Sequence, residues 1–133
     1  MKEWRFDPDD DLIIVKARVF GRHGDRLLNL ALDTAASHTH ILPDIIDELG
    51  YSPAEGEAIT SVNSAIGKER GYMLRVQRFE SLGFGFDDFS IHVHDLPTGI
   101  GLDGLLGLSF LKRFNYEIRS AEGRILVERI DSP

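Results

Sequence analysis

Two groups of residues in this sequence could carry out chemistry, and the first centres on Asp33. This acid ends a mostly apolar run over 28–32 and is followed by Thr34, two alanines and Ser37. A carboxylate at the end of a buried strand is costly unless it is hydrogen-bonded or paired, and the small residues after it leave room for a ligand. Two interpretations stay open on local grounds. The acid caps a turn by accepting backbone N–H groups, or it is a catalytic carboxylate.

The second group consists of two histidine pairs, His38 with His40 and His92 with His94. Because side chains two residues apart on a strand lie on the same face, the two rings of each pair share a face. Two such strands could converge on a metal ion, since neutral imidazole is a common zinc ligand. The alternative is four half-exposed histidines on strands. We favour this second interpretation and predict no metal site.

Composition limits the classes of protein to which the chain could belong. Its 133 residues fit one domain, and 42% hydrophobic residues are ordinary for a soluble globular protein. The formal net charge is −7 without a basic cluster, so we expect neither nucleic acid nor a membrane surface as a partner. Cysteine is absent, which excludes disulfides, thiolate metal sites and thiol catalysis. The polar N-terminus has no apolar signal core, so we expect a cytoplasmic protein.

The elements that must position Asp33 are predicted from hydrophobic pattern and turn residues. Residues 12–20 alternate from Val15 onward and predict a strand, and a glycine-bounded turn then leads into the apolar strand that ends at Asp33. Residues 1–11 are predicted to end in a solvated turn, Asp7-Pro-Asp-Asp-Asp11. A short strand is predicted within 38–42. A short helix over 43–50 follows, with proline at its first position and glycine at its end.

The second half of the chain is predicted to be mainly hairpins. Residues 58–78 predict two strands with a small polar tip, and 84–94 predict a half-buried strand. In the segment 102–115, glycines flank two leucines, which indicates a short strand in close backbone contact, and Ser109 is predicted to cap a helical turn. Residues 116–130 predict a last hairpin. The fold class is therefore all-β with one or two short helices.

Two motifs together resemble the retropepsin-like (retroviral-type) aspartic proteases. Leu30-Ala-Leu-Asp-Thr-Ala-Ala-Ser37 is similar to the family's apolar–apolar–Asp-Thr-Gly-Ala-Ser signature. Asp103-Gly-Leu-Leu-Gly107 with the following Leu-Ser-Phe-Leu is similar to its apolar–apolar–glycine motif and the helix after it. The order and separation of the motifs fit the family, and a glycine-containing hairpin lies between them where the family has its flap. The resemblance covers about residues 10–130.

The resemblance implies a closed β-barrel, the half of an acid protease, with one flap hairpin in a single domain over 1–133. It implies an aspartic endopeptidase that cleaves protein or peptide substrates without a metal or organic cofactor. Because the sequence holds one Asp-Thr-x-x-Ser motif, the second acid would come from another copy, so the active form would be a homodimer. Asp33 would be the catalytic acid, and Thr34 would hydrogen-bond across the two-fold axis.

The other roles that the resemblance implies concern packing and substrate. Leu105, Leu106 and Gly107 would pack beside the acid loop and exclude water from beneath it. The flap tip would close over an extended peptide, and apolar subsites would lie near the scissile bond. The substrate-binding residues implied in this way are Ala35, Ala36, Asn63, Ser64, Ala65, Ile66 and Gly67.

Two alternatives remain at this stage. The family usually has glycine where this chain has Ala35. If the backbone there needs a positive φ, alanine is strained by about 1 kcal/mol or more, and the chain could be a catalytically weak or inactive dimer that binds peptides. The second alternative pairs Asp33 with Asp103 in one chain, which would make a dimer unnecessary. We favour a turn role for Asp103, since it precedes Gly104.

Overall fold

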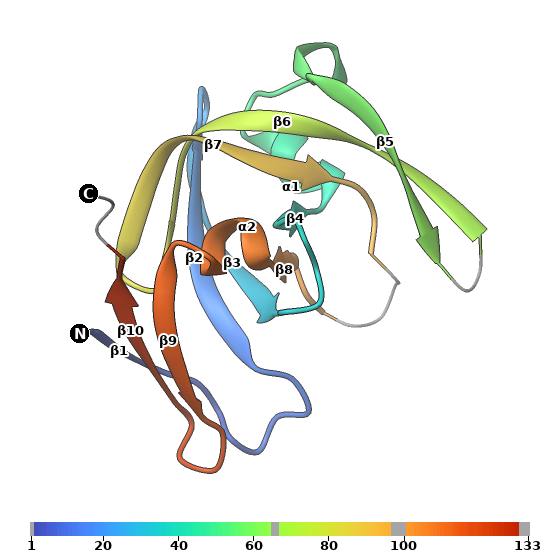
Figure 1. Cartoon of the computed structure of the whole chain (residues 1–133). Helices are drawn as coiled ribbons and strands as arrows, with labels where there is room; N and C mark the ends of the chain where they lie inside the picture. The colour runs from blue at the N-terminus through green and yellow to red at the C-terminus, as the bar shows by residue number, and fades with distance from the viewer. Residues whose placement is uncertain (1, 65–66, 97–100, 131–133) are drawn as a thin grey trace.

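The fold is a β-barrel closed by six strands, shown in Figure 1. This computed structural model describes residues 2–64, 67–96 and 101–130, with the backbone alone over 58–64 and 67–70. The larger sheet has the order β2-β3-β8-β4-β7-β6-β5, and an additional pairing of β2 with β6 closes it. A smaller sheet has the order β1-β10-β9.

The described elements follow one another in this order: β1 (Lys2–Arg5), β2 (Ile14–Gly21), β3 (Gly24–Leu32), β4 (His40–Ile41), α1 (Pro43–Glu48), a 3-10 turn (Pro53–Glu55), β5 (Ala58–Ser64), β6 (Gly67–Ser81), β7 (Phe84–Val93), β8 (Gly104–Leu106), α2 (Leu108–Leu111), β9 (Phe114–Arg119) and β10 (Arg124–Arg129). The prediction of a mostly β chain with short helices is confirmed.

Alternation of apolar and polar residues produces the strands that carry the acid. In β2, Val15, Ala17 and Val19 are buried inside the barrel while Lys16 points outward. In β3, the barrel face carries Leu28 and Leu30, both almost fully buried. The two strands form the predicted antiparallel hairpin, in register from Ile14 opposite Ala31 to Gly21 opposite Gly24. This hairpin orients the strand that leads into Asp33.

The core of the barrel is rich in aromatic rings around α2. Phe110 of α2 is fully buried, and its ring centroid lies 5.5 Å from that of Phe79 on β6. Phe79 in turn stacks on Phe89 of β7 at 4.9 Å. Offset and edge-to-face contacts of this kind add to the free energy gained from burying apolar area. The short helix is thereby fixed against two strands of the barrel.

The smaller sheet contains a strand that was not predicted from the sequence. The predicted turn after Asp7 is present, with the N–H of Asp10 donating to the Asp7 carbonyl oxygen at 3.3 Å. Before it, β1 pairs antiparallel with β10, from Lys2 opposite Val127 to Arg5 opposite Arg124. This strand was missed because its side chains are all exposed. An edge strand that is held by backbone hydrogen bonds leaves no hydrophobic pattern to find.

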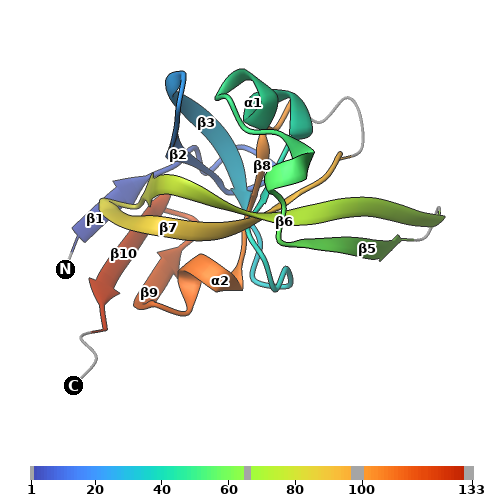
Figure 2. The ribbon, with the colours of Figure 1, turned by 90° about the horizontal axis from the view of Figure 1, so that it is seen from above.

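The hairpin of β5 and β6 extends away from the barrel. Figure 2 shows it reaching to one side, while β1, β10 and β9 lie at the opposite side of the molecule. The strands pair antiparallel up to Ser64 opposite Gly67. Near the barrel, β6 continues far enough to pair with both β7 and β2. The projecting hairpin is therefore a continuation of a barrel strand.

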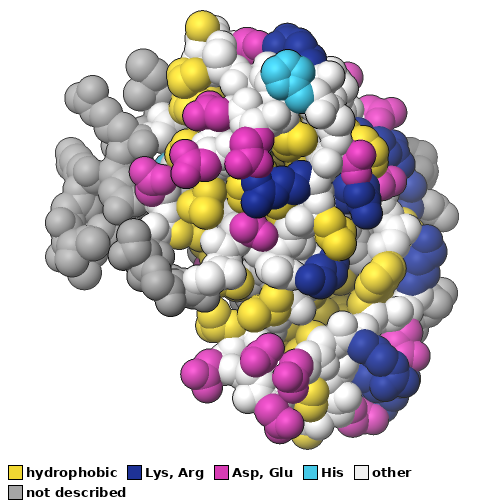
Figure 3. Space-filling model, turned by 180° about the vertical axis from the view of Figure 1, so that it is seen from behind, with side chains coloured by type: hydrophobic (Ala, Val, Ile, Leu, Met, Phe, Trp, Pro, Cys, Tyr) yellow, Lys and Arg dark blue, Asp and Glu magenta, His cyan; other side chains and the backbone are white. Residues whose placement is uncertain are grey.

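Charged side chains of both signs are interspersed on the face shown in Figure 3. Many charged side chains of the described residues form exposed ion pairs, such as Arg18 with Asp25 and Arg26 with Glu48. Exposed pairs of this kind add little to stability because water screens them. Among the described residues, no helix combines the length and apolar character needed to cross a membrane.

Candidate active site

The backbone holds Asp33 at the point where β3 ends. Strand β3 runs parallel to β8, with Leu32 opposite Leu106. The N–H of Asp33 donates to the carbonyl oxygen of Leu106 at 2.9 Å, so the ladder continues through the acid. Asp33 is half-buried. The barrel therefore holds the backbone of Asp33, whereas its side chain contacts the loop that follows.

The carboxylate of Asp33 is held by the turn that follows it. The N–H of Ala35 donates to Oδ1 of Asp33 at 2.9 Å, and the N–H of Ala36 donates to its carbonyl oxygen at 3.3 Å. Within the described part of the chain, the second carboxylate oxygen has no hydrogen-bond partner. Thr34 and Ala35 are exposed and Ala36 is half-buried. The acid thus makes the predicted turn contact and still offers one oxygen for chemistry.

Alanine at position 35 causes no backbone strain. Among the described residues, a positive φ at a residue other than glycine occurs at Leu82 and Asp88, and Ala35 is not one of them. The penalty for a left-handed conformation therefore does not apply at Ala35. Ala35 is exposed, and its methyl group only slightly reduces the space beside the carboxylate of Asp33. This finding removes the conformational argument against activity.

Close backbone contact joins the acid loop to α2. The N–H of Leu108 donates to the carbonyl oxygen of Ala36 at 2.8 Å, and the N–H of Ser109 donates to that of Ser37 at 3.0 Å. At Gly107, an added Cβ would lie 2.1 Å from the carbonyl oxygen of His38. No side chain fits in that space. The predicted packing of the glycine motif against the acid loop is present.

A buried hydroxyl pair strengthens this contact, and the sequence analysis missed it. Thr39 is fully buried, and its N–H donates to Oγ of Ser109 at 3.0 Å. Oγ of Ser109 lies 3.1 Å from Oγ1 of Thr39, which also accepts the N–H of Gly107 at 3.2 Å. The prediction that Ser109 caps α2 was wrong, because no side chain caps this helix and Gly107 is at the N-cap position. The sequence around Ser109 predicted a hydrogen bond within the helical turn, whereas the hydroxyl binds Thr39, which is 70 residues away in the chain.

Asp103 lies too far from Asp33 to form a catalytic pair within one chain. Its Oδ2 accepts the N–H of Asn29 at 2.8 Å, and its own N–H donates to the Asn29 carbonyl oxygen at 2.9 Å. Asn29 precedes Asp33 by four positions on an extended strand, a separation of about 13 Å. Asp103 therefore holds the β3–β8 junction, and the single-chain pairing with Asp33 is not supported.

The implied substrate-binding residues lie in two places. Ala35 and Ala36 follow the acid directly. Asn63 and Ser64 end β5 and Gly67 begins β6, with Ser64 opposite Gly67. Ala65 and Ile66 lie outside the described residues. The structure thus has a hairpin at the predicted position of the flap, far along the chain from the acid loop.

The family of the chain follows from a comparison with protein-family models. The model described as "Aspartyl protease" matches residues 15–110, which include the acid loop, the hairpin and the glycine motif. The chain belongs to the aspartyl protease family. No curated protein matches it in sequence.

Solved structures of other proteins share the fold of this aspartyl protease family member. A retropepsin-like aspartic protease from Rickettsia conorii superposes with a TM-score of 0.71 at 20% sequence identity, covering 95% of this chain and 99% of that one. The EIAV protease complexed with the inhibitor HBY-793 has a TM-score of 0.57 at 18% identity, covering 78% of this chain and 88% of that one. At these identities the likeness concerns the fold, which is retropepsin-like.

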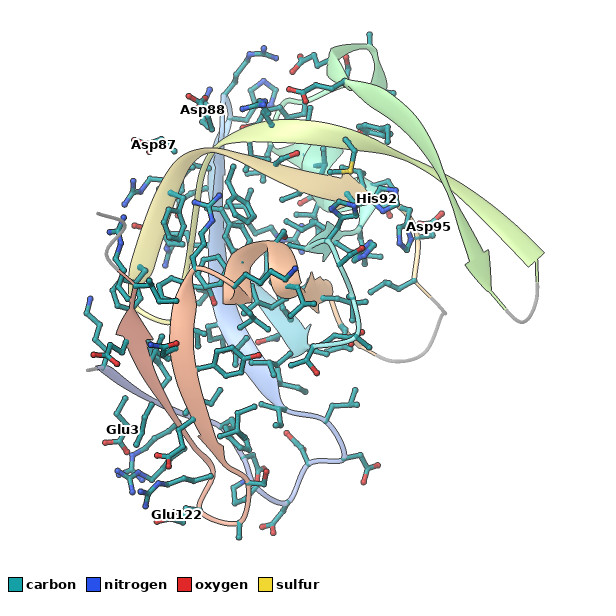
Figure 4. The ribbon with its side chains drawn as sticks, viewed as in Figure 1. Glu3, Asp87, Asp88, His92, Asp95 and Glu122 are labelled. Atoms are coloured by element: carbon teal, nitrogen blue, oxygen red, sulfur yellow. The ribbon has the colours of Figure 1, made fainter. Side chains whose placement is uncertain are left out.

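Three histidines of this aspartyl protease family member meet beneath the hairpin. Strands β4 and β7 run parallel with His40 opposite His92, and His94 follows on the same face as His92. Figure 4 shows His92 near the end of β7 and Asp95 just beyond it. The exposed fractions are 8% for His40, 3% for His92 and 6% for His94. The prediction of half-exposed histidines was wrong for these three, because the two strands pair within the closed barrel.

Burial keeps two members of this cluster neutral. Loss of hydration and, after it, repulsion from the imidazoles of His94, His92 and His38 together lower the pKa of His40 to about 4. Burial and, after it, repulsion from His94 and His38 lower the pKa of His92 to about 4. An unfolded histidine has a pKa of about 6.5. Between these two values the unfolded chain binds more protons than the folded protein.

We expect the free energy of unfolding to fall as the pH is lowered from about 6.5 to 4. Because the folded pKa values lie below the unfolded values, stability is complete above the unfolded pKa and is lost on acidification. One pKa unit corresponds to about 1.4 kcal/mol, so we expect each of the two histidines to contribute a loss of about 3 kcal/mol over this range. Urea denaturation at pH 7.5 and at pH 4.5, with EDTA present at both, measures this loss in the free energy of unfolding. His40→Gln should flatten the dependence, whereas an unchanged slope in this variant would contradict the assignment.

Proposed function

We propose that this chain is an aspartic endopeptidase whose active form is a homodimer, with Asp33 from each copy at the two-fold axis. The observation that carries the proposal is the way in which the backbone and the carboxylate of Asp33 are held. Its backbone is held by β8, one carboxylate oxygen is held by the turn, and the loop residues Thr34 and Ala35 beside it are exposed. An exposed loop that carries a fixed acid is suited to meeting its own copy across an axis.

The proposed chemistry needs two carboxylates and one water molecule. Two carboxyl groups about 3 Å apart do not ionise together easily, so they share a proton and titrate as a pair. The ionised Asp33 takes a proton from the water as it attacks the peptide carbonyl carbon. The protonated partner donates its proton to the carbonyl oxygen. Asp33 then passes its proton to the amide nitrogen as the C–N bond breaks. At the same time the partner carboxylate takes a proton from a hydroxyl of the tetrahedral intermediate, so the acid and amine products form and the pair again shares one proton.

The proposed substrate is an extended peptide segment. An extended chain binds by backbone hydrogen bonds, as an added strand would, and alternate side chains enter the subsites. The end of the β5–β6 hairpin would close over the peptide, with Asn63, Ser64 and Gly67 contributing backbone groups. Ala35 and Ala36 would line the subsites nearest the scissile bond. Thr34 would hydrogen-bond across the axis. The mechanism requires no metal ion or organic cofactor.

A concentration series tests the dimeric endopeptidase directly. Cleavage of a quenched fluorescent peptide library is measured between about pH 3 and 7, where a carboxylate pair titrates, together with sedimentation velocity at each protein concentration. We expect activity per chain to rise with the fraction of dimer. Cleavage by a monomer, with activity per chain independent of concentration, would refute the proposal. A dimer that binds library peptides without cleaving them would favour the alternative, a catalytically inactive peptide-binding module of the same fold.

A further inference from the structure

The geometry points to a site for a divalent transition-metal ion of the zinc class, formed by His40, His92 and His94 at the root of the β5–β6 hairpin. The three side chains each offer one ligand nitrogen, and these nitrogens all lie within 4.8 Å of one another. The ring centroids form a nearly equilateral triangle. The sides measure 4.9 Å from His40 to His92, 4.6 Å from His40 to His94 and 4.8 Å from His92 to His94.

The hydrogen bond of His94 to the next backbone carbonyl determines its neutral tautomer. Its Nδ1 lies 2.5 Å from the carbonyl oxygen of Asp95. A carbonyl oxygen can only accept, so Nδ1 carries the proton and the buried Nε2 keeps its lone pair when the ring is neutral. A backbone carbonyl that orients a histidine in this way is the usual support of a metal-binding imidazole.

His40 supplies a second reason to infer a ligand. Its Nδ1 is buried and has no hydrogen-bond partner among the described residues. A buried polar atom without a partner is costly and uncommon in folded proteins. A bound cation would satisfy this nitrogen.

The distances are compatible with tetrahedral coordination after small movements of the rings. Zinc–nitrogen bonds of about 2.0–2.1 Å place tetrahedral ligands about 3.3 Å apart. The nitrogens therefore need to approach by about 1.5 Å at most, which rotation of the rings can provide. Three neutral imidazoles suit zinc, copper, nickel or iron rather than magnesium or calcium. Such a set leaves the fourth position for a water molecule.

The position of the cluster assigns it a structural role at the flap. Gly71 lies on β6, where the hairpin leaves the barrel, and pairs with Thr60 of β5. An added Cβ at Gly71 would lie 2.7 Å from Nε2 of His92 and 2.5 Å from the carbonyl oxygen of Val93. The flap strand therefore rests directly on the cluster. A metal bound there would fasten β4 to β7 beneath the base of the hairpin.

Metal titration of the Asp33→Asn protein tests the site. This background prevents autolysis and separates the result from the proposed peptidase activity. After EDTA treatment and its removal, Zn²⁺ should bind at one ion per chain and raise the melting temperature by about 5 °C, while Mg²⁺ has no effect. Co²⁺ should produce the visible absorption bands of tetrahedral nitrogen coordination. His94→Gln should weaken Zn²⁺ binding about 100-fold or more, since even changes around metal ligands cost 10–100-fold.

The matched control is His23→Gln, since His23 is an exposed histidine on the β2–β3 turn and is not a member of the cluster. We expect this variant to bind Zn²⁺ as strongly as its parent. Should His94→Gln fail to fold by circular dichroism, the Co²⁺ spectrum of its parent still decides the question. The proposal is overturned if the parent binds no Zn²⁺, if its Co²⁺ complex lacks tetrahedral bands, or if folded His94→Gln binds as tightly as the parent.

Discussion

Replacement of Asp33 by asparagine is expected to lower peptide cleavage about 10⁴-fold, the magnitude typical of losing acid–base catalysis. In a homodimer the single substitution removes both carboxylates. Asparagine is nearly isosteric, and its side-chain oxygen can still accept the N–H of Ala35 that Oδ1 accepts in the wild type. The loop and the barrel should therefore stay intact. Cleavage of the peptide library measures the loss, and thermal denaturation with sedimentation confirms that fold and association persist.

Asp103→Asn is the matched control for this loss. Its side-chain oxygen can still accept the N–H of Asn29, as Asp103 does, so cleavage should stay within about two-fold of wild type. An equal loss in both variants would instead favour a catalytic pair within one chain. Residual cleavage above a tenth of wild type in Asp33→Asn would exclude this residue as the catalytic acid.

Mixing wild-type and Asp33→Asn chains tests whether the two acids belong to different copies. With random pairing at equal amounts, about a quarter of the dimers carry two acids. Activity should therefore fall to about a quarter of that of an all-wild-type sample of the same total concentration. A fall to one half would show that each chain acts alone.

Gly107→Ala is expected to lower the free energy of unfolding by about 3 kcal/mol or more. Gly107 has φ −104°, which alanine can adopt, so the cost comes from space alone. The new methyl carbon would lie 2.1 Å from the carbonyl oxygen of His38 and 2.8 Å from that of Ala36. Since both contacts are backbone, the acid loop must move away from α2. Cleavage should fall together with the melting temperature.

Gly24→Ala provides the comparison for Gly107→Ala. Gly24 begins β3, at the opposite end from the acid, and an added Cβ there meets no atom within 4 Å, although its φ is +112°. We expect a cost of about 1 kcal/mol from the backbone conformation, with cleavage unchanged. Thermal denaturation and library cleavage are measured for both variants. The comparison separates the steric cost of the added methyl group at Gly107 from the cost of the backbone conformation at Gly24. If Gly107→Ala were as stable and active as wild type, close packing would not position the acid loop.

The elements around Asp33 could be predicted because their signals are local. Alternation in β2, the apolar run of β3 and the proline that begins α1 each depend on neighbouring residues, and each element lies where it was expected. The exposed strand β1 was not predicted, because its pairing with β10 depends on backbone hydrogen bonds to residues more than 100 positions away. Ser109 was given a local role for the same reason, although its hydroxyl binds Thr39.

The sequence by itself determined the all-β class, the acid at the end of an apolar strand and the glycine motif that packs beside its loop. Only the tertiary structure decided that Asp103 binds Asn29, that Ala35 needs no positive φ, and that His40 lies opposite His92. The physical reason is that periodicity determines which face of a strand is buried, whereas the register between distant strands determines which side chains meet. That register arises from closing the whole barrel, so no short stretch of the chain contains it.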